Sequence, residues 1–144
     1  MFSFWTILRI VYSLFFTIIN IYITQFIKGI ENKKNCELST GWRITNGKVI
    51  SSLLIIIGII NIFVPASKFL STLPIIGSSY VLIFVLALLG ELFIVNRLSI
   101  NIGEDDNIKC TPKGFDMLIN YFSNTTFFEC IIMTVVLSIL FFYL

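Results

Sequence analysis

Residues 2–27 read FSFWTILRIVYSLFFTIINIYITQFI, a run of 26 residues in which Arg9 is the one charged side chain. A helix rises 1.5 Å per residue, so this run forms a helix about 39 Å long, whereas the hydrocarbon core of a bilayer is about 30 Å thick. No small-residue cleavage site follows the run, so it does not resemble a signal peptide that is removed. We therefore expect a retained helix that spans a membrane.

Three more apolar stretches follow, at residues 49–69, 73–95 and 125–144. The first of these is continuous only to Val64. It reaches a spanning length by extending back to Ile44 or forward to Phe69, and a re-entrant or strongly tilted segment is the alternative. Segments this few cannot close a barrel, so the backbone must satisfy its hydrogen bonds within helices. The sequence predicts an all-α integral membrane protein, a four-helix transmembrane bundle that occupies residues 1–144 as a single domain.

Composition narrows the classes of function. Hydrophobic residues make up 57% of the chain and charged residues 12%, which is too little polar surface for a soluble domain of this size. The net charge of +2 is too small to favour nucleic acid as a partner. The sequence has no histidine, glycine-rich phosphate loop or carboxylate-rich metal cluster. We expect no enzyme activity, no metal site and no cofactor.

The connections between the apolar stretches carry helix-breaking residues. Pro65 and Pro74 flank the connection between the second and third stretches, which predicts a tight antiparallel hairpin. In the last connection, Thr111 and Pro112 resemble an N-cap followed by a first-turn proline. Apolar side chains then fall on one side of a helix, at Phe115, Leu118, Ile119 and Phe122. We expect a short interfacial amphipathic helix over residues 112–123, and a plain start of the last helix is the alternative.

Basic residues set the expected orientation. Lysine and arginine gather in two connections, at Lys28, Lys33, Lys34, Arg43, Lys48, Arg97, Lys109 and Lys113. The opposite side holds only Arg9 and Lys68. The positive-inside rule therefore places residues 28–48 and 96–124 in the cytosol and both termini on the far side. Cys36 and Cys110 share the first of these sides. In the cytosol they would be free or palmitoylated, and in a lumen they would form a disulfide.

A polar stripe runs along the first helix at steps of three and four residues. Its members are Thr6, Arg9, Ser13, Thr17, Asn20 and Thr24. Lipid is a poor neighbour for these side chains, and membrane helices associate through such residues. We expect a docking face for another subunit, and packing against the chain's own helices is the alternative. The remaining Phe, Ile, Leu and Tyr side chains of this helix suit lipid.

Two carboxylates lie within apolar runs, Glu91 in the third and Glu129 in the fourth. Charged groups at such positions are commonly functional, and under the expected topology the two lie at similar depth. A close pair of carboxylates shares a proton and relays it. The alternative is an interfacial pair that is solvated or bridged to Arg97, because both lie about one turn inside the boundary.

Two resemblances to known families follow from the residues. The segment Arg43–Phe63 followed by Ser78–Phe93 resembles the four-span Golgi proteins of the COPI-associated family. The stretch Glu31-Asn32-Lys33-Lys34-Asn35 and the scarcity of alanine are typical of an AT-rich genome. A small membrane protein of this composition resembles the apicomplexan-type accessory subunit of a P-type cation-transporting ATPase. This resemblance implies a large transporter as the partner and transfers no site residues.

The sequence therefore predicts a non-catalytic accessory or assembly subunit of a larger membrane complex, with an ion pump or transporter as the preferred host. Its partners are a larger integral membrane protein and lipid. The plasma membrane is the favoured location, and an endomembrane or the mitochondrial inner membrane is the alternative. Two other functions stay open. One is a small autonomous channel or proton carrier that uses Glu91 and Glu129, and the other is a Golgi trafficking or scaffold protein.

Overall fold

The computed structural model describes residues 3–33, 36, 41–66, 68, 71, 74–102 and 111–144. The elements in these residues are α1 (Phe4–Glu31), α2 (Trp42–Phe63), α4 (Pro74–Ile102), α5 (Asp116–Ser123) and α6 (Phe127–Tyr143). No strand occurs among the described residues. The expectation of an all-α chain is confirmed.

Length and hydropathy indicate a membrane protein. Three described helices, α1, α2 and α4, are long and apolar enough to cross a membrane. Helix α6 has 17 residues, and it passes the same criterion only together with α5, to which it is joined by a bend of 111°. The described part of the chain thus offers three spans, or four when the bent pair counts as one.

The helix ends follow from local chemistry. The Ser3 hydroxyl accepts a hydrogen bond from the Thr6 backbone N–H at 3.2 Å, which caps the first turn of α1. The Thr126 hydroxyl does the same for α6, where it accepts from the Glu129 N–H at 3.2 Å. Helix α2 ends one residue before Val64, which Pro65 follows.

Several boundaries differ from the sequence-based expectation. Helix α1 continues past residue 27 to Glu31, and α2 ends at Phe63 rather than 69. Helix α2 begins at Trp42 rather than 49, so it reaches a spanning length by extending back past Ile44, which was one of the two expected extensions. Helix α4 begins at Pro74 as expected but continues past residue 95 to Ile102. Helix α5 begins at Asp116 rather than 112, because Gly114 has a φ of 87°, which no α-helix adopts. Thr111 is therefore not its N-cap.

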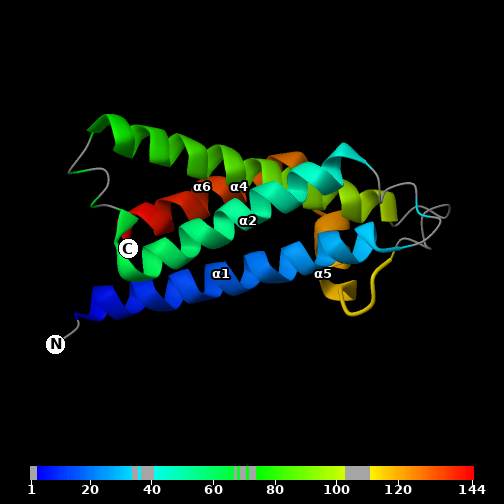
Figure 1. Cartoon of the computed structure of the whole chain (residues 1–144), viewed down its shortest axis with the longest axis horizontal. Helices are drawn as coiled ribbons and strands as arrows, with labels where there is room; N and C mark the ends of the chain where they lie inside the picture. The colour runs from blue at the N-terminus through cyan, green and yellow to red at the C-terminus, as the bar shows by residue number, and fades with distance from the viewer. Residues whose placement is uncertain are drawn as a thin grey trace.

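The helices pack as a bundle in which α2 lies between α1 and α4, and α4 carries α5 and α6 (Figure 1). Helix α1 meets α6 only locally. Helix α5 lies at the end of the bundle where α1 ends and α2 begins, and α1 starts at the end where α6 finishes (Figure 1). This arrangement leaves most of one flank of α1 uncovered by α6.

An aromatic cluster holds α1, α4 and α6 together where they meet. The rings of Phe84 and Phe141 stack with centroids 4.1 Å apart, and Phe16 packs against them at 5.7 Å and 5.8 Å. All three side chains are buried. Stacked and tilted aromatic pairs add to the dispersion energy of the contact, so this cluster fixes how the three helices sit against one another.

Candidate functional site

The polar stripe of α1 lies against α2, inside the bundle. Five of its members are buried, namely Arg9, Ser13, Thr17, Asn20 and Thr24, and Thr6 is half-buried. The Asn61 side-chain amide of α2 donates to Ser13 Oγ at 2.6 Å, and the Arg9 guanidinium donates to the Ile62 carbonyl at 3.4 Å. Thr17 faces Gly58 at the close approach of the two helices. In the described structure these side chains therefore lie against α2, which is the arrangement that the alternative of packing within the chain predicts.

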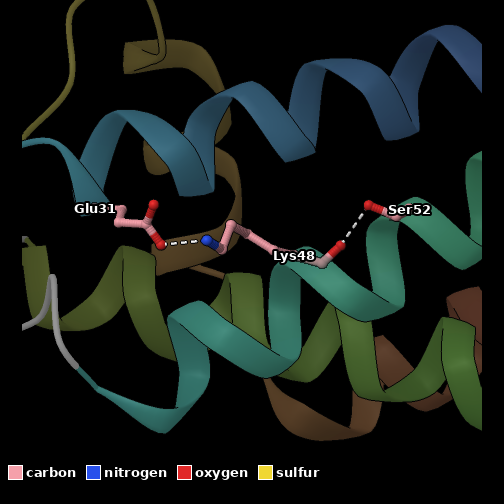
Figure 2. A network of polar contacts seen from close by, with 3 residues as sticks. All are labelled: Glu31, Lys48 and Ser52. Atoms are coloured by element: carbon pink, nitrogen blue, oxygen red, sulfur yellow. Dashed lines mark hydrogen bonds and ion pairs between the residues drawn. The ribbon is translucent and has the colours of Figure 1, made fainter.

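The α1–α2 hairpin is closed at its other end by an ion pair. Lys48 Nζ of α2 lies 2.5 Å from Glu31 Oε2, the last residue of α1, and both side chains are about one-third exposed (Figure 2). The Ser52 hydroxyl, one turn further along α2, donates to the Lys48 carbonyl at 2.7 Å (Figure 2). The pair lies at the basic end of the bundle, where partly exposed charges reach water.

The bend between α5 and α6 depends on one buried amide. Asn96 of α4 is 3% exposed, and its Nδ2 donates to the carbonyls of Phe122 and Thr125, both at 2.7 Å. Carbonyls at a helix C-terminus lack hydrogen-bond donors within the helix. Asn96 supplies one donor to the end of α5 and one to the turn that follows. This contact holds the two helices at their sharp angle and presses the apolar side of α5 onto α4.

A long apolar groove opens between α1 and α6, with α4 as its floor and α5 at one end. Its volume is about 1160 Å³. Tyr12 crosses the floor and donates a hydrogen bond to the Leu137 carbonyl of α6 at 2.8 Å. Along α1 the lining includes Trp5, Leu8, Tyr12, Phe15, Ile19 and Tyr22. The groove exists because α1 packs on α2 and leaves this flank open.

Two polar side chains stand out in this apolar lining, Asn20 of α1 and Glu91 of α4. They are 1% and 2% exposed. Asn20 Nδ2 donates to the Phe16 carbonyl at 2.8 Å, but Asn20 Oδ1 has no hydrogen-bond partner among the described residues. Ser51 Oγ of α2 lies beside the Glu91 carboxyl, and Glu91 Oε2 also lacks a partner there. Several buried polar atoms of the described residues lack a partner, and these two oxygens are distinguished by belonging to side chains that line the groove.

The two candidate carboxylates have different surroundings. Glu91 is buried in the bundle, whereas Glu129 is exposed in the first turn of α6. No hydrogen bond joins them, and Arg97 is exposed and lies over the ring of Phe93 at 5.5 Å. Glu91 is therefore neither paired with Glu129 nor bridged to Arg97. Arg97 follows Glu91 by six helical residues, so Arg97 lies about 9 Å closer to the C-terminal end of the helix axis.

The cysteines take different states. Cys36 is buried and forms a disulfide, Cys130 is buried and free, and Cys110 lies outside the described residues. A disulfide is typical of an oxidising compartment, whereas the lysine and arginine count predicts that residues 28–48 face the cytosol. The disulfide and the basic residues therefore favour opposite sides of the membrane for residues 28–48. Within the described residues, no group of three or more potential metal ligands occurs.

Sequence reasoning missed the groove, although α1 carries a signal for it. The lining residues Trp5, Leu8, Tyr12, Phe15, Ile19 and Tyr22 recur at alternating steps of three and four, which is the spacing of a helix–helix seam. Their apolar character suits lipid equally well, so only the position of α6 separates a groove from a lipid-facing flank.

No known protein family matches the chain, and no characterised protein or solved structure matches it. The fold by itself defines the class, a helical protein whose long apolar helices suit a membrane.

Proposed function

We propose that this chain is a non-catalytic accessory subunit that binds a transmembrane helix of a larger membrane protein in the groove between α1 and α6. The observation that carries the proposal is the shape of the groove. Its lining on α1 runs from Trp5 to Ile23, which corresponds to about 27 Å along a helix. That length is close to the roughly 30 Å thickness of the hydrocarbon core. A transmembrane helix fills such a length, whereas a lipid tail reaches through one leaflet.

The volume also fits a helix that lies partly in the groove. A helix about 10 Å across and 27 Å long occupies roughly 2000 Å³. The groove of about 1160 Å³ therefore has room for roughly half of the helix volume. The lining is aromatic and aliphatic, and the exposed α1 side chains Val11 and Ile19 stand where a partner would contact them. This surface replaces the polar stripe as the docking site.

An ion pump or transporter is the preferred host. The AT-rich composition and the small size resemble the accessory subunits of P-type cation-transporting ATPases. We place the chain in the plasma membrane as a four-span bundle in which α5 lies in the interface. Residues 28–48 and 96–124 face the cytosol in this proposal, where their lysines and arginines contact the host or anionic lipid headgroups. Binding of the host would stabilise this chain by mass action.

The test is a mild-detergent pull-down of the tagged protein from its native membrane, with the bound proteins identified by mass spectrometry. Wild type is expected to retain one large membrane protein at fixed stoichiometry. Ile19→Trp fills the groove and should release that protein. Ile21→Trp is the matched control, because Ile21 is 41% exposed on the same helix but does not line the groove.

Either of two results would overturn the proposal. One is a lone small particle or a homo-oligomer in the wild-type sample, which would return weight to an autonomous carrier. The other is equal retention of the host by Ile19→Trp and Ile21→Trp, which would place the contact elsewhere on the chain.

A further inference from the structure

Two side chains that line the groove each hold a hydrogen-bond acceptor without a partner in the described chain. Glu91 Oε2 and Asn20 Oδ1 are both unpartnered, and both side chains line the groove while being at least nine-tenths buried. The Asn20 amide nitrogen is already bound to the Phe16 carbonyl, so the oxygen is the free end of that side chain. Oxygens of a carboxylate and of an amide both accept hydrogen bonds, so each of these two oxygens can still accept one, beside the Ser51 hydroxyl that already lies next to the Glu91 carboxyl.

The basic side chains that could supply donors are held elsewhere. Lys48 pairs with Glu31 at the end of the bundle, and Arg97 lies over Phe93 on the exterior. Arg9 donates to the Ile62 carbonyl near the opposite end of α1. Among the residues that the structure describes, the ion pair found is that of Lys48 with Glu31, and none involves Glu91.

We infer that the helix bound in this groove carries a lysine or arginine whose side chain pairs with Glu91 and donates to Asn20. The inference rests on the proposed function, because it names the chemistry of the partner that fills the same groove. Hydrogen bonds between a cationic donor and a carboxylate are roughly twice as strong as neutral ones. Ionisable residues within membrane spans pair with one another, so a basic residue at this depth on the partner meets its complement at Glu91.

The position of Glu91 specifies where the basic residue sits. From Pro74, 17 helical residues lead to Glu91, or about 26 Å, and 11 more lead to Ile102, or about 16 Å. The carboxyl thus lies inside the bundle rather than at the end of α4. Side chains of lysine and arginine are long enough to reach such a group from a helix in the groove, since they extend along apolar surface to place the charge.

The test uses a probe of known sequence. The purified full chain is placed in phosphatidylcholine vesicles with a fluorescent synthetic transmembrane peptide of about 24 leucine and alanine residues. One peptide carries a single lysine about one turn inside one of its ends, because Asn20 lies three residues from the Ile23 end of the groove, and the other carries a leucine at that position. Energy transfer to a dye on the protein reports binding. The lysine peptide is expected to bind about tenfold more tightly, which corresponds to about 1.4 kcal/mol.

Variants assign the preference to the site. Glu91→Leu removes the acceptor and should abolish the tenfold preference while the protein stays folded, because an apolar side chain of similar size replaces a buried polar one. Glu91→Gln retains one acceptor oxygen and should keep part of the preference. Glu129→Leu is the matched control, since it removes an exposed carboxylate from α6 and should leave binding unchanged.

The outcomes separate this inference from the proposed function. Equal binding of the two peptides, or failure of the lysine peptide to bind, overturns the inference. So does a preference that survives Glu91→Leu. If both peptides bind equally and Ile19→Trp releases both, the groove is still the docking site and only the basic partner residue is wrong. If the Ile19→Trp variant still retains the host in the pull-down, the groove is not the docking site.

Discussion

The hydrogen bond between Asn61 and Ser13 is the contact whose energetic role is most sharply defined by the structure. Both side chains are completely buried, and Asn61 Nδ2 lies 2.6 Å from Ser13 Oγ. Asn61 Oδ1 also accepts from the Ala66 backbone N–H at 3.0 Å, just beyond the end of α2. One amide therefore joins α1 to α2 and satisfies the turn after α2. We predict that the pair Asn61→Leu and Ser13→Ala is strongly non-additive.

The magnitudes follow from what each change leaves unpaired. Ser13→Ala removes the interhelical bond and should cost about 1 kcal/mol, since such bonds in membranes contribute about 0.6 to 1.7 kcal/mol. Asn61→Leu removes the same bond and also strands the Ala66 N–H, so it should cost about 2 to 3 kcal/mol. Once Asn61 is gone, Ser13 has no partner across the interface. Ser13→Ala in the Asn61→Leu background should then cost almost nothing, which gives a coupling of about 1 kcal/mol.

The assay is unfolding of the purified protein in mixed micelles, titrated with sodium dodecyl sulfate and followed by far-ultraviolet circular dichroism. The four proteins of the double-mutant cycle are compared under the same conditions. Ser52→Ala is the control, because its exposed hydroxyl bonds only to the Lys48 carbonyl of its own helix. It should change stability by less than about 0.5 kcal/mol and add independently to Asn61→Leu. Additivity of Asn61→Leu and Ser13→Ala within about 0.3 kcal/mol would refute the reasoning.

Three further predictions use other features of the bundle. Gly58→Leu should destabilise the protein by about 1 to 3 kcal/mol in the same assay, because a Cβ there meets Thr17 Oγ1 and lies 3.2 Å from Phe16 Cδ1. Gly90→Ala should be tolerated, since its Cβ would be 3.5 Å from Ile50 Cδ1, and equal costs for the two would contradict the close approach of α1 and α2. Lys48→Ala should cost less than about 1 kcal/mol, with a smaller difference from wild type at high salt, since the pair is partly exposed. For orientation, a membrane-impermeant thiol reagent applied to sealed, inside-out vesicles should label a cysteine introduced at Lys33 in a protein whose three native cysteines are replaced by serine. Labelling only from the other side would reverse the proposed topology.

Several features of the fold are encoded locally and were predicted from the sequence. Apolar runs of spanning length place α1 and α4, and Pro74 begins α4 as expected. The stripe on α1 was recognised as a packing face from its spacing alone. The helix that packs against this face was not predicted, because a spacing of three and four residues is the same whether the neighbour is α2 or another protein. The buried bond between Asn61 and Ser13 connects residues 48 positions apart, and no local pattern contains that pairing.

The same distinction applies to the carboxylates. The sequence singled out Glu91 and Glu129 as unusual, and their similar depth suggested a pair. Depth is a property of one helix, whereas the direction in which a side chain points within the bundle depends on how the helices are rotated against each other. Packing turned Glu91 inward and left Glu129 exposed.

The sequence by itself determined the apolar helices, their approximate lengths, the polar stripe on α1 and the clustering of basic residues at one end. These depend on composition and on the period of a single helix. The tertiary structure alone decided that α2 covers the polar stripe, that α1 meets α6 only locally, and that Asn20 and Glu91 line one groove. Each of these depends on which helix neighbours which. Within a bilayer all apolar flanks are equivalent to lipid, so hydrophobicity cannot select the neighbour, and packing and hydrogen bonding between helices do.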